Sequence, residues 1–107
     1  GMRMQAVMNF TLNSLSDQIK LEEVAALANM STNAFCRYFK QRTNKSYFQF
    51  LIEIRVEHAS TLLTNKVDLS ISEVAESSGF QNLSNFNRRF KKEKGVTPSQ
   101  FRRENVI

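Results

Sequence analysis

An internal repeat of about fifty residues constrains this chain more than any other feature. The first block of the repeat is Leu21, Glu23, Val24 and Ala25, and it returns fifty residues later as Ile71, Glu73, Val74 and Ala75. After one inserted residue near Gln81 comes a second block, in which Phe35, Arg37, Phe39 and Lys40 return as Phe86, Arg88, Phe90 and Lys91. A chain that repeats itself at this spacing is expected to build one small structural unit twice.

Helix start signals recur at matching places in the two copies. Ser46, Ser70 and Thr97 are each followed three residues later by Glu or Gln, which is the capping-box pattern of a helix N-terminus. Pro98 stands at the first helical position after Thr97, where its missing N–H is not needed. Lys20 takes the place that Ser70 has in the second copy, and it has no oxygen with which to cap. We therefore expect a weaker helix start after Lys20.

Helix stop signals complete the assignment of elements. Gly79 and Gly95 fall where a left-handed residue ends a helix, and Asn44 holds the place equivalent to Gly95. The 107 residues include only three glycines and one proline, too few turn-forming residues for a fold of strands and turns. We predict an all-α fold of about seven helices, over residues 2–14, 21–28, 32–43, 46–64, 71–78, 83–94 and 98–104.

The excess of positive charge falls in two segments, one in each copy, and each segment includes the second helix of its copy. Residues 31–45 carry four positive charges and no negative one, and residues 81–103 carry seven positive charges against Glu93 alone, although the whole chain has a net charge of only +5. In each copy a short helix with small residues on its apolar stripe precedes the basic helix by three or four residues. This arrangement is typical of helix-turn-helix units that present a recognition helix to DNA.

The expected organisation is therefore one DNA-binding domain over residues 1–107. Two helix-turn-helix subdomains, at about 15–45 and 65–107, are joined by a central linker helix at about 46–64.

Helical periodicity separates a buried side from an outer side on each basic helix. At about 100° per residue, Phe35, Tyr38 and Phe39 share one stripe, and Leu83 is expected on the buried side with Phe86 and Phe90. The outer sides carry the candidates for reading bases: Asn33, Cys36, Arg37, Ser84, Asn87 and Arg88. The candidates for contacting phosphates are Ser31, Lys40, Lys45, Asn82, Lys91, Lys92 and Arg102. Because arginine binds guanine O6 and N7 with two donors, Arg37 and Arg88 are the strongest base-reading candidates.

The second copy resembles the signature of the AraC/XylS transcription regulators in the run Gly79-Phe80, Ser84, Phe86, Arg88, Phe90-Lys91-Lys92, Gly95, Thr97-Pro98-Ser99 and Phe101-Arg102. The first copy is similar to that family in Leu21-Glu22-Glu23-Val24-Ala25, Ser31, Phe39-Lys40, Arg55, Ala59 and Leu62-Leu63, so the likeness covers about residues 19–103. Cys36 departs from the pattern, because a polar hydrogen-bonding residue is more frequent there and a thiol makes only weak or apolar contacts.

The resemblance implies a bacterial regulator that inserts two recognition helices into successive major grooves. A single cysteine, which cannot form an intramolecular disulfide, favours the reducing cytoplasm as its location. Its implied partners are double-stranded promoter DNA and RNA polymerase, which it recruits or blocks. Family members usually carry a sensing or dimerising domain before this one, so a missing N-terminal domain is a further possible partner. The chain is either the C-terminal part of such a regulator or a small complete one.

Other function classes are less consistent with the sequence. His58 and Cys36 lie in separate predicted helices, without a phosphate-binding loop or a carboxylate cluster, so we expect no enzyme and no catalytic residue. One cysteine and one histidine cannot form a structural zinc site, and we expect no metal and no cofactor. No run approaches 18 apolar residues, the length that indicates a membrane span, and we expect no membrane partner.

A protein-interaction module is the alternative that stays open. In that case the first helix would dock onto a partner domain through its apolar residues Met4, Val7, Met8, Phe10 and Leu12. A salt titration separates the two possibilities, because binding through several phosphates weakens steeply with salt and docking of an apolar helix does not.

Overall fold

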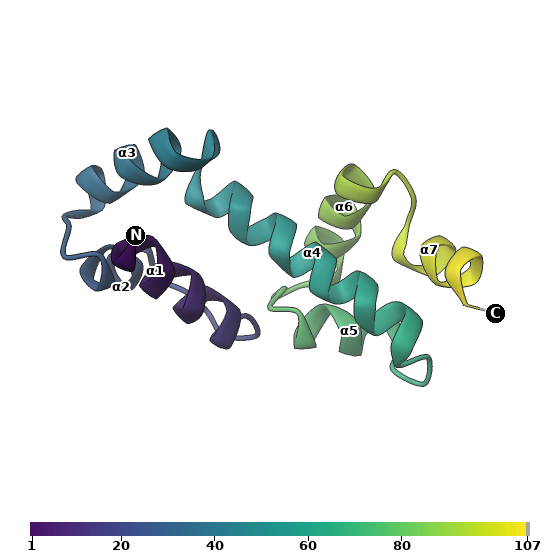
Figure 1. The fold of residues 1–107 in the computed structure, drawn as a ribbon. Helices are drawn as coiled ribbons and strands as arrows, with labels where there is room; N and C mark the ends of the chain where they lie inside the picture. The colour runs from purple at the N-terminus through teal and green to yellow at the C-terminus, as the bar shows by residue number, and fades with distance from the viewer. Residues whose placement is uncertain (107) are drawn as a thin grey trace. The chain divides into compact units, whose positions relative to one another are not determined.

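The computed structural model describes residues 1–106, and these residues form seven α-helices with no strand among them. The helices are α1 (Met2–Asn13), α2 (Leu21–Leu27), α3 (Thr32–Thr43), α4 (Tyr47–Asn65), α5 (Ile71–Ser77), α6 (Leu83–Lys94) and α7 (Pro98–Asn105), as Figure 1 shows. The all-α prediction is confirmed, and each helix begins and ends within one residue of its predicted bounds. None of these helices is both long enough and apolar enough to span a bilayer.

The chain divides into two compact units, and the division falls inside α4. The first unit, Gly1–Leu51, contains α1, α2, α3 and the first residues of α4. The second unit begins at Ile52 and contains the rest of α4 with α5, α6 and α7. Each unit therefore contains one copy of the repeat.

The core of the first unit is an aromatic cluster with one buried hydrogen bond. Phe35 and Phe39 are fully buried, and their ring centroids lie 5.7 and 5.4 Å from that of Tyr47. The hydroxyl of Thr11, on α1, donates to the carbonyl of Val7 at 2.8 Å and lies 2.6 Å from the Tyr47 hydroxyl oxygen. Because the Thr11 proton is used on Val7, the Tyr47 hydroxyl donates to Thr11. This bond ties α1 to the start of α4.

The core of the second unit is built around two phenylalanines of α6. Phe86 and Phe90 are fully buried, and their ring centroids are 5.7 Å apart. The other buried members of this core come from α4, α5 and the turn after α5: Val56, Ala59, Leu63, Val74, Ala75 and Phe80. Phe101 of α7 packs against it, with its ring edge-on to Phe90 at 5.4 Å.

One core prediction is wrong. Leu83 was expected on the buried side of α6 and is instead 41% exposed. It is the first residue of α6, one turn before Phe86, and it is not among the side chains packed against the core of the second unit. The apolar stripe of α6 thus continues to the N-terminus of the helix, whereas the core of the second unit does not reach that far.

The two short helices, α2 and α5, begin differently, as the sequence predicts. At α5 the Glu73 N–H donates to the Ser70 hydroxyl at 3.0 Å, and the Ser70 N–H donates to the Glu73 carboxylate at 2.9 Å. Hydrogen bonds from the Ser70 backbone and then from its hydroxyl hold the pKa of the Glu73 carboxyl below its ordinary value. At α2 only the bond from the Lys20 N–H to Glu23 forms, at 3.3 Å, because an ammonium group cannot accept.

Candidate nucleic-acid interface

The turn that leads into the second helix of each pair has the same construction in both units. Between α2 and α3, the Met30 N–H donates to the Ala25 carbonyl at 3.0 Å, and Asn29 is left-handed with φ of 57°. Between α5 and α6 the equivalent closing bond is also 3.0 Å, and Gly79 is left-handed with φ of 91°. This pattern of bonds around a left-handed residue is the Schellman motif. The two recognition helices therefore follow the same type of turn, although only one turn contains glycine.

The short helices carry small, buried residues at matching places. Ala25 and Ala28 at α2, and Ala75 and Ser78 at α5, are all at most 3% exposed. A small side chain lets the backbone of a neighbouring helix approach closely. The stripe of small residues predicted from the sequence is thus buried in both units, and α2 contacts α3 as α5 contacts α6.

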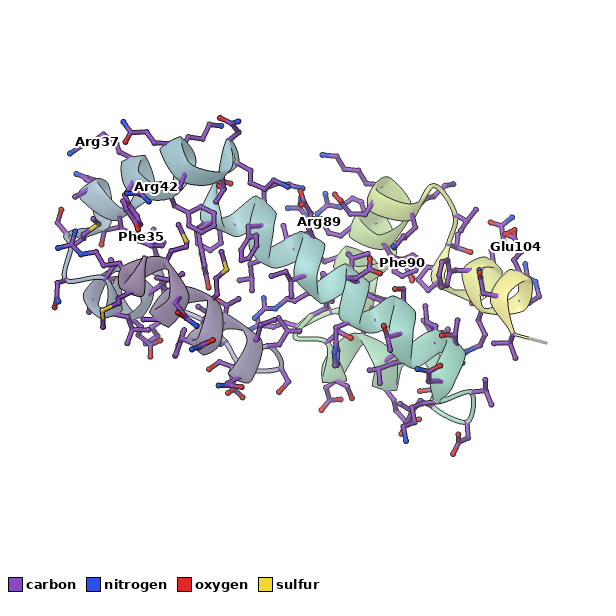
Figure 2. The ribbon with its side chains drawn as sticks, viewed as in Figure 1. Phe35, Arg37, Arg42, Arg89, Phe90 and Glu104 are labelled. Atoms are coloured by element: carbon purple, nitrogen blue, oxygen red, sulfur yellow. The ribbon has the colours of Figure 1, made fainter. Side chains whose placement is uncertain are left out.

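Helices α3 and α6 each have one side buried in their own unit and the other exposed. Figure 2 shows Phe35 on the side of α3 that faces α1, and Arg37 pointing away on the opposite side. All six predicted base-reading residues are exposed: Asn33, Cys36, Arg37, Ser84, Asn87 and Arg88. The structure thus leaves a polar, basic side free on α3 and on α6.

The N-termini of both recognition helices suit an anion. Ser31 accepts a hydrogen bond from the Ala34 N–H at 3.2 Å, and Asn82 accepts one from the Asn85 N–H at 2.7 Å, so each predicted phosphate contact also caps its helix. Neither helix has an acidic residue in its first turn. The uncompensated positive end of a helix dipole attracts phosphate, which makes these exposed caps natural places for a DNA backbone.

The predicted phosphate-binding lysines lie toward the other ends of the two helices. Lys40, Lys91 and Lys92 are exposed, and Lys45, in the loop after α3, is half-buried. The lysines and the capping residues thus lie toward opposite ends of each helix, with the residues predicted to read bases between them.

Arg102 lies in different surroundings from the other predicted phosphate contacts. Its guanidinium donates to three backbone carbonyls: from Nη1 to Leu69 at 2.7 Å, from Nε to Leu63 at 3.0 Å and from Nη2 to Lys66 at 3.3 Å. These carbonyls belong to the last turn of α4 and the loop after it. Arg102 therefore ties α7 to the end of α4, a role that local sequence spacing does not reveal.

Further cations of the basic segments make contacts within their own unit. The Lys94 ammonium lies 2.7 Å from the Glu57 carboxylate, and the Arg42 guanidinium carbon lies 4.9 Å from the centroid of the Tyr38 ring. Arg88, on the exposed side of α6, donates from Nη2 to the Asn85 side-chain oxygen at 2.9 Å. The spacing of three residues between asparagine and arginine on a helix is the signal that could have predicted this last bond.

Candidates for other chemistry are dispersed. Cys36 is a free, exposed cysteine, and His58 is exposed on α4. In the described part of the chain, no three His, Cys, Asp or Glu side chains gather where they could hold a metal ion.

Comparison with known proteins identifies the family. The family described as "Helix-turn-helix domain" matches residues 24–104. The chain belongs to the AraC/XylS helix-turn-helix family. Two curated relatives of this AraC/XylS chain are an uncharacterized transcriptional regulatory protein, YesN, of Bacillus subtilis and the HTH-type transcriptional regulator MtrA of Neisseria gonorrhoeae. YesN is 40% identical over 70% of this chain, and MtrA is 36% identical over 82% of it.

A solved structure shares both sequence and fold with this chain. It is the DNA-binding domain of AdpA, a global transcriptional factor, in complex with a target DNA. It is 32% identical, covers 97% of this chain and 93% of its own, and has a TM-score of 0.91. By contrast, the chain spans only 21% of the length of YesN and 29% of that of MtrA.

Proposed function

We propose that this AraC/XylS-family chain is a sequence-specific regulator that binds promoter DNA, with α3 in one major groove and α6 in the next. The observation that carries the proposal is the division of both helices into a buried aromatic side and an exposed polar, basic side. A major groove admits one α-helix, and its base edges require the donors and acceptors that these exposed sides provide. The AdpA domain, crystallised with its target DNA, supports duplex DNA as the ligand.

The proposed contacts fall into two classes. Arg37 and Arg88 each bind a guanine through two donors, and Asn33, Cys36, Ser84 and Asn87 contact neighbouring base edges. The phosphates are bound by the caps Ser31 and Asn82 and by Lys40, Lys45, Lys91 and Lys92. Arg102 was predicted for this second class, but its three carbonyl contacts support a role inside the second unit.

The remaining partners concern the whole protein. Since the chain spans a minor part of YesN and MtrA, we include in the proposal a further domain that senses a signal or dimerises. RNA polymerase is the proposed target of the regulation, and the proposed location of the protein is the bacterial cytoplasm. The proposal gives this chain no catalytic step.

Helix α1 supports the protein-interaction alternative less well than its sequence suggested. Val7, one of the five apolar residues expected to dock, is fully buried in its own unit, while Met2 and Leu12 are 90% and 58% exposed. Met4, Met8 and Phe10 are half-buried, so part of the apolar surface expected to dock is covered by the unit itself.

The proposed function is tested by selecting fragments from a random DNA library and titrating the best one with salt. We expect a defined consensus and a steep loss of affinity with salt. Each phosphate neutralised makes the slope of log affinity against log salt more negative by about 0.9, so four lysines predict a slope of about −3.6. Binding that selects no sequence, or that hardly changes with salt, would contradict the proposal.

A further inference from the structure

The exposed sides of α3 and α6 differ in how their arginines are held. On α6 the Arg88 Nη2 donates to the Asn85 side-chain oxygen at 2.9 Å. Asn85 is half-buried and belongs to the first turn of α6, where its own N–H donates to the Asn82 cap at 2.7 Å. The residue that holds Arg88 therefore belongs to the capped first turn of the helix, and its side chain is half-buried.

The first copy lacks this arrangement because one side chain differs. Arg37 takes the place of Arg88 in the repeat, and Ala34 takes the place of Asn85. The backbone is alike at the two positions, since the Ala34 N–H also donates to its helix cap, Ser31, at 3.2 Å. Alanine has no acceptor in its side chain, so it cannot hold Arg37 in the way that Asn85 holds Arg88.

We propose that Asn85 is a positioning residue that makes the second unit discriminate its guanine more strongly than the first unit does. The inference rests on the proposed DNA-binding function. An arginine without such a bond can turn to a phosphate when its base pair is not G·C, and so recovers part of the lost interaction. An arginine held by Asn85 must break a hydrogen bond to do the same, and the wrong base is therefore penalised more.

The size of the effect follows from the freedom that a long side chain loses on binding. Ordering a flexible side chain at an interface reduces affinity by about two- to tenfold. Asn85 orders Arg88 in the free protein. The ratio of affinities for G·C and A·T should therefore be larger for Arg88 than for Arg37 by a factor in this range.

The test exchanges the two side chains in the complete chain, as Asn85→Ala and as Ala34→Asn. Selection with Arg88→Ala and with Arg37→Ala first identifies the base pair that each arginine reads. Competition binding then measures the ratio of affinities for G·C and A·T at each of the two base pairs. We expect Asn85→Ala to lower the ratio at the Arg88 base pair about two- to tenfold and to leave the ratio at the Arg37 base pair unchanged. Ala34→Asn should raise the ratio at the Arg37 base pair.

A third variant separates positioning from folding. Asn85→Asp keeps an oxygen at the same place and should keep the ratio at the Arg88 base pair, even though its negative charge weakens binding to all DNA. Alanine forms helix better than asparagine, so loss of the ratio in Asn85→Ala cannot come from an unfolded α6, and a thermal melt checks this.

The outcomes also separate this inference from the proposed function. If the wild-type chain selects a sequence but Asn85→Ala leaves both ratios unchanged, the inference is overturned and the proposed function stands. If Asn85→Asp loses the ratio as Asn85→Ala does, the oxygen is not responsible, and the inference is again overturned. A wild-type chain that selects no sequence overturns both.

Discussion

Replacing Arg102 by alanine should destabilise the second unit without changing the number of phosphates that the chain contacts. The guanidinium makes three hydrogen bonds, at 2.7, 3.0 and 3.3 Å, to carbonyls that follow one another around the end of α4. A hydrogen bond from a charged donor contributes about 1.5–3 kcal/mol where water is excluded. Arg102 is only half-buried, and its longest bond is exposed, so the lower end of this range applies to the two shorter bonds.

The expected loss is therefore about 3 kcal/mol of unfolding free energy. For a domain of this size, 1 kcal/mol corresponds to a change of roughly 4–8 °C in the melting temperature. Circular dichroism in urea and during heating measures both quantities. Arg103→Ala is the matched control, because Arg103 is the next residue on α7 and is exposed, and it should change stability by less than about 0.5 kcal/mol.

DNA binding gives the second half of the test. A lost phosphate contact would lower the magnitude of the salt slope by about 0.9, whereas a structural arginine leaves the slope of the folded protein unchanged. An Arg102→Ala protein that melts like wild type and has a slope smaller by about one would refute the structural role and restore the phosphate contact.

Three further tests probe what stabilises each unit by itself. Lys20→Ser supplies the cap that α2 lacks and should raise the unfolding free energy by about 1 kcal/mol in a urea titration; no gain would mean that the cap is not limiting. Tyr47→Phe and Thr11→Val should each lower the unfolding free energy by about 1 kcal/mol or more, because each change leaves one hydroxyl of a buried hydrogen bond without the other. The double variant should lose less than the sum of the two, and additive losses would contradict the bond. Glu73 has a depressed pKa in the folded state, so its stabilisation is present above its ordinary pKa of 4.5 and is lost as the pH falls through the folded value. Acid titration of stability should thus show a smaller loss for Glu73→Gln than for wild type, and identical curves would count against the role of the Ser70 bonds.

The helices could be predicted closely because their ends are encoded locally. Ser70, Thr97, Gly79 and Gly95 act within one turn of their own position, and the structure places each where the sequence signal puts it. The buried sides of α3 and α6 were also predictable, since they depend only on helical periodicity and on the core that each unit forms. The failure at Leu83 shows the limit of this reasoning, because periodicity gives direction but not the extent of the core.

The exposure of the six base-reading candidates could be predicted from helical periodicity, but the long-range contacts of Arg102 could not. Arg102 is a cation in a basic segment, which made it a candidate for a phosphate contact. The three carbonyls that it binds lie 33 to 39 residues away in the sequence. Only the packing of α7 against the end of α4 brings them together. The bond from Arg88 to Asn85 is local. Helix α3 has an arginine at the equivalent position but lacks this bond, because alanine takes the place of the asparagine.

Methylation protection at guanine N7 on a selected fragment tests the central claim most directly, because a bidentate arginine covers that atom. Wild-type protein should protect guanines in two separate segments of the fragment. Arg37→Ala should expose the guanine in one segment only, and Arg88→Ala the guanine in the other. Protection confined to one segment, or the same protected guanines in wild type and in both variants, would contradict the claim that α3 and α6 each read DNA through their exposed arginine.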